Sequence, residues 1–231
     1  MLSGLAARVW RDVDRAVIAG VDMQGIRITP IDAALSKRCL DLASAVFARS
    51  SVLHRSLGIS ADRYRDQLHT AFARMIDEGL SLAAIDQPSG EIAGCIIVTD
   101  FHSAIPPAPD GSDPLAPVTA LTRQLALRYK ELRPLPPGKV ILIDMAAVAE
   151  AHGGRGLYRA LRNAAHARAK ALGYQRVVGE LSSAATQHVV LKHLGHENLA
   201  EIAYRDFTFQ GDQPFSAIAE PHGIILAEGK L

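Results

Sequence analysis

A glycine-rich turn follows a long apolar stretch in the second half of the chain. Three of the four residues 153–156 are glycine; they come shortly after the apolar run 139–148, and apolar residues at helical spacing follow from Leu157. Glycine lets backbone amides approach a bound anion, and a helix N-terminus carries free amides and a partial positive charge. Arg155 and Arg159 add cations that favour phosphate oxygens. The pattern predicts a pyrophosphate cradle, although a tight strand-to-helix turn needs glycine in any case.

Two specific nucleotide-binding motifs are absent from this turn. The Walker pattern of Gly, four residues and Gly-Lys-Ser/Thr does not occur there, which excludes a P-loop. The Gly-x-Gly-x-x-Gly pattern is also missing, and the turn comes after several predicted strands and not after the first. A dinucleotide-binding fold is therefore not expected.

The elements that must position this turn follow from hydrophobic periodicity. The run 139–148 is apolar over almost its whole length, so we expect a central strand covered on both faces. Residues 102–116 are expected to form a surface loop because they are rich in Pro, Asp and Gly. The predicted strands are 26–28, 80–86, 91–101, 139–148, 176–181, 199–209 and 222–230, and the predicted helices are 2–19, 33–47, 61–78, 118–132, 157–172 and 184–194.

Composition and charge place the chain among soluble globular proteins. Of its 231 residues, 48% are hydrophobic, and 25 basic against 24 acidic side chains give a formal net charge of +1. No like-charge run favours nucleic acid or an anionic membrane as a partner, and no apolar run is long enough for a membrane span or a signal peptide. Cys39 and Cys95 lie far apart without metal-type spacing, so we expect a reducing, cytoplasmic environment.

Other residue types that often do chemistry form no catalytic pattern in this sequence. His188 and His193 lie in a predicted helix but miss the i,i+4 spacing of a helical zinc pair. The Gly-x-Ser-x-Gly turn of Ser-His-Asp hydrolases does not occur. Neither a metal site nor a hydrolase triad is predicted.

The glycine turn resembles the main motif of the GNAT superfamily of acyl-CoA-dependent N-acetyltransferases. That motif is a strand ending in Val, about four residues, and then Arg/Gln-x-x-Gly-x-Gly/Ala at the start of a helix. Val148 falls on the strand-end valine and Gly156 on the first motif glycine, whereas Gly153 replaces the Arg or Gln and Tyr158 replaces the second Gly or Ala. The order of the predicted elements is similar to that of the superfamily over 25–231. Residues 102–138 and the chain end look like the arylalkylamine N-acetyltransferase branch.

The resemblance implies a fold, a cofactor and a reaction. The fold is α/β of the α+β kind, with a mixed, mostly antiparallel sheet flanked by helices in a domain at 25–231, preceded by a helical extension at 1–24. Strands 140–148 and 176–181 are then a splayed parallel pair that holds the pantetheine arm of acetyl-CoA. The acyl group passes to a primary amine of a small molecule by direct attack in a ternary complex. The implied cofactor contacts are Ala146, Ala147, Val148, Gly153, Gly154, Arg155, Gly156, Leu157, Tyr158 and Arg159.

The same resemblance suggests the acid and base of the reaction. Asp144 lies at a strand position where some arylalkylamine N-acetyltransferases place a catalytic histidine, and an apolar strand is a costly place for an unused carboxylate. We therefore expect Asp144 to be the general base, with Glu180 as second candidate; the alternatives are a hydrogen bond from Asp144 to a loop and a solvated Glu180.

Leu191 stands where the family often has a tyrosine as general acid, so the thiolate can take its proton from solvent. Tyr158, Tyr204, Ser182 and Ser183 are alternative acids, although the serines also fit helix caps and the tyrosines the core.

Two alternatives remain open from the sequence. The departures at Gly153, Tyr158 and Leu191 are also compatible with a non-catalytic acyl-CoA-binding or ligand-sensing protein on the same fold. The apolar stripe of the predicted helix 2–19 fits either packing on its own domain or the contact of a homodimer.

Overall fold

Within residues 23 and 25–231, which the computed structural model describes, seven strands form one open sheet. Their order is β1-β2-β3-β4-β5-β7-β6, and each neighbouring pair is antiparallel except β4 with β5. The predicted mixed, mostly antiparallel sheet is thereby confirmed. The strands are β1 (Ile26–Pro30), β2 (Leu82–Asp86), β3 (Ile92–Asp100), β4 (Val140–Val148), β5 (Arg176–Leu181), β6 (Glu197–Ala203) and β7 (Gly223–Lys230).

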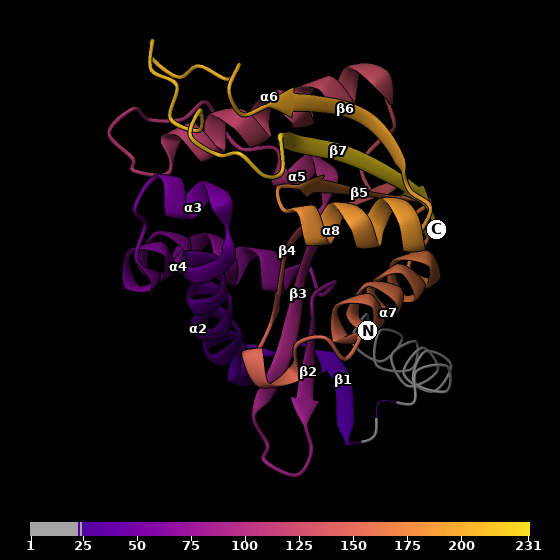
Figure 1. Cartoon of the computed structure of the whole chain (residues 1–231). Helices are drawn as coiled ribbons and strands as arrows, with labels where there is room; N and C mark the ends of the chain where they lie inside the picture. Colours follow the sequence, from indigo (N-terminus) through magenta and orange to yellow (C-terminus); the bar gives the residue numbers. More distant parts are fainter. Residues whose placement is uncertain (1–22, 24) are drawn as a thin grey trace.

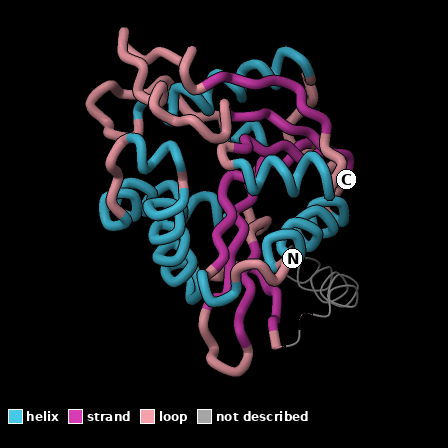
Figure 2. The backbone as a smooth tube through the Cα atoms, in the orientation of Figure 1, coloured by secondary structure: helices cyan, strands magenta, loops and turns pink. Residues whose placement is uncertain are grey.

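Helices cover both faces of this sheet (Figure 1 and Figure 2). Helices α2, α4 and α6 pack on one face, while α7, α8 and η2 pack on the other. None of the described helices is both long and apolar enough to cross a membrane. Their bounds are α2 (Ala33–Ser50), α3 (Val52–Ser56), α4 (Ala61–Asp77), α5 (Phe101–Ala104), α6 (Ala116–Leu132), η1 (Glu150–His152), α7 (Leu157–Ala171), α8 (Ala184–Gln187) and η2 (His188–His193).

Strand β4 is buried on both faces, as its apolar run predicts. Ile141 and Ile143 pack in the cluster that includes α7, whereas Val140 and Leu142 pack in the cluster that includes α6. Successive side chains of a strand point to opposite faces, so both faces of the strand need apolar cover. This explains why the sequence of β4 does not alternate between apolar and polar residues.

Strands β4 and β5 pair only over their first four residues. The parallel register runs from Val140 opposite Arg176 to Ile143 opposite Gly179 and then stops, although both strands continue. On its other side, β4 stays paired with β3, but the register shifts so that Asp144 has no opposite residue. Beyond Ile143 the β5-facing edge of β4 is therefore free, and the two strands form a fork.

Several local elements differ from the predictions. The predicted helix 184–194 is a short α-helix followed by a π-helix, η2, and the predicted strand 199–209 ends at Ala203 because its partner β7 begins at Gly223. Two short helices, α3 and α5, were not predicted, although side chains of Ser51 and Asp100 cap their N-termini. The predicted helix 2–19 lies outside the described residues, so the division into 1–24 and 25–231 stays a prediction.

A buried carboxylate ties the second half of the sheet to α6. Glu228 on β7 is 4% exposed and accepts hydrogen bonds from the Tyr129 hydroxyl at 2.6 Å and from Arg176 Nη1 at 2.7 Å. Arg133 Nε lies 3.4 Å from the same carboxylate. Removing one partner from a buried charge network of this kind destabilises the fold, because it leaves an uncompensated charge.

We expect Glu228→Gln to lower the free energy of unfolding by about 2 kcal/mol, because it leaves Arg176 without its buried counter-charge. Urea denaturation followed by circular dichroism measures this change. The control is Glu197→Gln, whose exposed carboxylate lies 3.8 Å from Arg133 and whose loss should cost less than about 1 kcal/mol. Equal stabilities of the two variants would show that the buried network contributes nothing.

Candidate active site

Two acidic side chains lie where β4 and β5 separate. Asp144 follows the last β4 residue that pairs with β5, and Glu180 follows Gly179, the last β5 residue in that pairing before the fork. Both carboxylates are half-buried and line the same cavity. In the part of the chain that the structure describes, neither carboxylate has a hydrogen-bond or ion-pair partner. The structure thus brings together the two predicted acid–base candidates and leaves both free to contact a ligand.

Burial raises the pKa of both carboxyl groups. It raises the pKa of Asp144 to about 6, and the negative charge of Glu78 contributes further. It also raises the pKa of Glu180 well above its usual value, with an additional contribution from the charge of Asp144. Interacting carboxyl groups titrate as a pair, so the first proton is lost at a lower pH than the second. At neutral pH this pair contains a carboxylate basic enough to take a proton from a substrate.

A cavity passes through the sheet at the fork. We call it the splay cavity. Because α7 and α2 lie on opposite faces of the sheet and both line this cavity, it connects the two faces. Its lining includes Val46, Phe47, Ser51, Asp144, Ala146, Tyr158, Arg162, Glu180, Ser182, Ser183 and Thr186.

A second cavity, which we call the apolar cavity, adjoins the first at the same two carboxylates. Its wall near Asp144 is aromatic: the rings of His54 and Tyr64 lie 4.3 Å apart, and Phe47 stacks on Tyr64 at 5.7 Å. The Tyr64 hydroxyl donates to Met145 Sδ at 3.4 Å, and both burial and the charge of Asp144 raise its pKa. Other lining residues are Leu53, Leu68, Met75, Phe101, Val118, Ala126 and Leu142.

The glycine turn before α7 has the backbone geometry of an open helix N-terminus. Gly154 and Gly156 have φ of +69° and +79°, in the left-handed region that favours glycine. Gly156 is the N-cap of α7 and supplies no side-chain hydrogen bond, so amides of the first turn face outward without a side-chain cap. Gly153 has φ of −63°, and a Cβ there would lie 3.2 Å from the Glu150 carbonyl oxygen. Gly153 therefore allows the chain to pack closely against the Glu150 carbonyl oxygen, whereas its backbone conformation does not require glycine.

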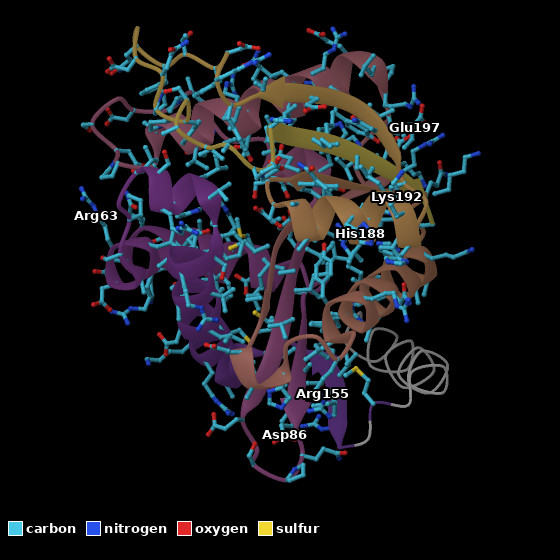
Figure 3. All side chains as sticks on the ribbon, viewed as in Figure 1. Arg63, Asp86, Arg155, His188, Lys192 and Glu197 are labelled. Carbon is cyan, nitrogen blue, oxygen red and sulfur yellow. The ribbon has the colours of Figure 1, made fainter. Side chains whose placement is uncertain are left out.

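Cations gather beside this turn. Arg155, labelled in Figure 3 at the turn that precedes α7, lines a polar groove together with Arg159 and Lys230. The described residues that line this groove include no acidic side chain. Positive side chains and a helix N-terminus at one place favour an anionic group there.

The side chains of the predicted cofactor contacts do not all face the cavities. Ala146 and Tyr158 line the splay cavity, but Ala147 and Leu157 are 1% exposed and belong to the core. Leu157 packs close to Gly94, where an added Cβ would lie 3.3 Å from its Cδ2. Val148 also packs against the core, at the end of the free part of β4. At Ala147 and Leu157 only backbone groups are available to a ligand, whereas Val148 is half-buried.

Arg162 on α7 is a site residue that the sequence analysis did not identify. Its side chain lines the splay cavity and is 1% exposed, and its Cζ lies 5.6 Å from the ring centre of Tyr158. An arginine in a helix normally projects to solvent, so the residue type did not indicate a buried side chain at the site. The available signal was its position one helical turn after Tyr158 and next to the inward-facing Leu161.

Comparison with known proteins identifies the fold. Neither a protein-family model nor a curated protein matches the sequence. Among solved structures, the C-terminal condensation domain of Ebony in complex with β-alanyl-dopamine has a TM-score of 0.81, with 16% identity over 90% of this chain and 100% of that chain. Arylalkylamine N-acetyltransferase 2 from Aedes aegypti has a TM-score of 0.75, with 18% identity over 90% of this chain and 99% of that chain.

A bacterial structure extends this similarity. YncA from Salmonella typhimurium, described as a putative acetyltransferase with its cofactor acetyl-CoA, has a TM-score of 0.52 with 17% identity over 90% of this chain and 95% of that chain. Identities this low establish architecture alone. The sheet order, the fork between β4 and β5 and these structures agree that the chain has the GNAT fold.

Proposed function

We propose that the protein is an acetyl-CoA-dependent N-acyltransferase that transfers the acetyl group to a primary amine of a small molecule by direct attack in a ternary complex. The observation that carries this proposal is the fork. A free strand edge and two carboxylates without partners among the described residues border the splay cavity, and α7, whose Tyr158 lines that cavity, begins at an open helix N-terminus. A donor with an anionic end, an extended amide-bearing arm and a reactive thioester would suit these three features.

The chain offers a distinct group to each part of acetyl-CoA. Amides of residues 154–159, with Arg155 and Arg159, would hold the pyrophosphate. The free backbone edge of Ala146–Val148 would pair with the amides of the pantetheine arm, as a neighbouring strand does. The thioester would then lie at the fork beside Asp144. Similarity to a structure that contains acetyl-CoA supports this assignment.

The apolar cavity would bind the amine acceptor. Its aromatic and aliphatic lining suits an acceptor with an apolar body, and Asp144 and Glu180 at its inner end would receive the amine. Asp144 would take the proton of the attacking nitrogen, with Glu180 as the second candidate, and the thiolate would take a proton from solvent. The similar structures named for β-alanyl-dopamine and for arylalkylamines support a small amine.

The carboxylates favour an enzyme over the alternative of a ligand sensor. Half-burying two carboxyl groups without protein partners costs free energy, which contacts with a bound amine would offset. A general base needs a raised pKa and an open position facing its substrate. Asp144 has both.

The working environment and partners are inferred from the sequence. Cys39 and Cys95 are buried free thiols, which supports a reducing, cytoplasmic location. The formal net charge of +1 supports a small-molecule partner and not nucleic acid or a membrane. A homodimer through residues 1–24 stays a prediction.

Titration calorimetry with acetyl-CoA, with ATP and NADH as controls, tests the proposal. A thiol-release assay with acetyl-CoA and a panel of tryptamine, dopamine and hexylamine then tests the reaction. Selective binding of acetyl-CoA with release of CoA in the presence of an amine is the expected result. Binding without turnover would favour the sensor, and no binding would remove the basis of the proposal.

We expect Gly156→Val to weaken acetyl-CoA binding by about tenfold or more, because valine cannot hold the left-handed φ that opens the cradle. The matched control is Gly173→Val at the other end of α7, where φ is +89° and a Cβ likewise meets nothing within 4 Å. Both variants should lose similar thermal stability. Equal acetyl-CoA affinity of the two variants in calorimetry would contradict the cradle assignment.

We expect kcat/KM to fall as the pH drops through about 6, because protonated Asp144 cannot accept a proton. Asp144→Asn should lower kcat by roughly 10²-fold or more at neutral pH. The pH profile of the thiol-release assay measures both effects. Full activity of Asp144→Asn would transfer the role of base to Glu180 or to water.

Glu78 provides a control for this pH profile. Its charge raises the pKa of Asp144. Glu78→Gln should therefore shift the acidic fall of kcat/KM to lower pH and change the maximal kcat/KM little. Glu91→Gln removes an exposed carboxylate that pairs with Arg38 and should leave the acidic fall in place. An acidic fall that stays unmoved in Glu78→Gln would show that Asp144 does not cause it.

A further inference from the structure

Arg162 is a buried cation at the fork with unused hydrogen-bond donors. The side chain is 1% exposed, and its Nε and Nη1 have no hydrogen-bond partner among residues 23 and 25–231. Its Nη2 lies 3.0 Å from the position that a Cβ on Gly179 would occupy. Gly179 is the last β5 residue paired with β4 before the fork, so the guanidinium lies against the point where the strands part.

Another buried arginine on the same helix shows what a structural role looks like. Arg168 is 4% exposed, and its Nε donates to the carbonyl oxygen of Gly79 at 2.8 Å, which ties α7 to the turn before β2. An arginine that is buried without such partners destabilises the fold, because its charge has lost water and gained no acceptor. Arg162 thus has the burial of Arg168 without its hydrogen bonds to the backbone.

The groups around Arg162 do not neutralise its charge. Tyr158 is its aromatic neighbour and forms a hydrogen bond with the guanidinium, but burial raises the pKa of the Tyr158 hydroxyl, so Tyr158 stays neutral and supplies no counter-charge. Burial and the charge of Arg162 lower the pKa of His166 to about 3 and that of His196 to about 4, so both rings are neutral. Glu180 follows Gly179 on β5, so its side chain projects from the face of the strand opposite to the one that Arg162 packs against.

We propose that Arg162 donates a hydrogen bond to the carbonyl oxygen of the acyl group in the donor and stabilises the negative charge that develops on this oxygen during transfer. The assignment rests on the proposed N-acyltransferase function. It uses what the structure provides: fixed N–H donors in a buried place, on the donor side of the fork where the thioester would lie. Preorganised donors of this kind act mainly on the transition state.

The step balances with the groups already assigned. The amine nitrogen forms a bond to the carbonyl carbon, and the C=O electron pair moves onto the oxygen held by Arg162. The ammonium proton passes to the carboxylate of Asp144. The electron pair then returns from the oxygen, the C–S bond breaks, and the thiolate leaves and takes a proton from solvent. The products are the amide and free CoA.

The test compares two buried arginines on one helix. With acetyl-CoA and the amine of the panel that is acetylated fastest, Arg162→Met should lower kcat on the order of 10²-fold. Its Kd for acetyl-CoA in calorimetry should change by no more than a few-fold, and its melting temperature should not fall, because a buried charge without a counter-charge is removed. Arg162→Lys should recover part of kcat.

The control variant is Arg168→Met. It should lower the melting temperature, because the Gly79 carbonyl loses its donor, and leave kcat per folded molecule unchanged. The role of Arg162 is overturned if Arg162→Met keeps kcat within twofold, or if it loses melting temperature and acetyl-CoA affinity together, as a structural residue would. Failure of the unsubstituted protein to bind acetyl-CoA would instead overturn the proposed function itself.

Discussion

The separation of β4 from β5 after four paired positions is the constraint on which the rest of the structure depends. Two parallel strands that stayed paired to their ends would satisfy each other's backbone groups and leave no room between them. Their separation exposes one edge of β4 and opens the splay cavity from α7 to α2. The register shift that leaves Asp144 without an opposite residue lies at the same point. Strand geometry therefore places the carboxylate and the cavity together.

The surrounding elements hold this opening in place. Helix α7 lies close to the sheet because Gly94 has no side chain; a Cβ there would lie 3.0 Å from the Ala147 carbonyl oxygen and 3.1 Å from Leu161. This close packing sets the position of the glycine turn at the end of β4. On the far side, Glu228 joins β5, β7 and α6 through Tyr129 and Arg176. The two halves of the sheet are thus anchored separately on either side of the fork.

The charged side chains of this protein fall into two groups, according to whether they have hydrogen-bond partners in the protein. Glu228 and Arg168 are buried with hydrogen-bond partners, and they connect elements. Asp144 and Glu180, which are half-buried, and Arg162 lie at the fork; among the described residues, the two carboxylates and Nε and Nη1 of Arg162 have no such partners. Unsatisfied polar groups reduce stability, so a fold that gathers three of them around one cavity uses stability to prepare a binding place. If the proposed function holds, Arg162 on the α7 face would meet the donor, and Asp144 and Glu180 at the apolar cavity would meet the acceptor.

The sequence by itself determined most elements and the glycine turn, because periodicity and glycine content are local properties. The central strand 139–148, the turn 153–156 and the carboxylates Asp144 and Glu180 were all recognised there. Tertiary structure decided the length of the β4–β5 pairing, the π-helix η2 and the burial of Arg162. These features depend on contacts between residues distant in sequence. The position of Arg162 on the helix placed it near the inward-facing Leu161, but only packing decided that its side chain is buried against a cavity and not turned to water.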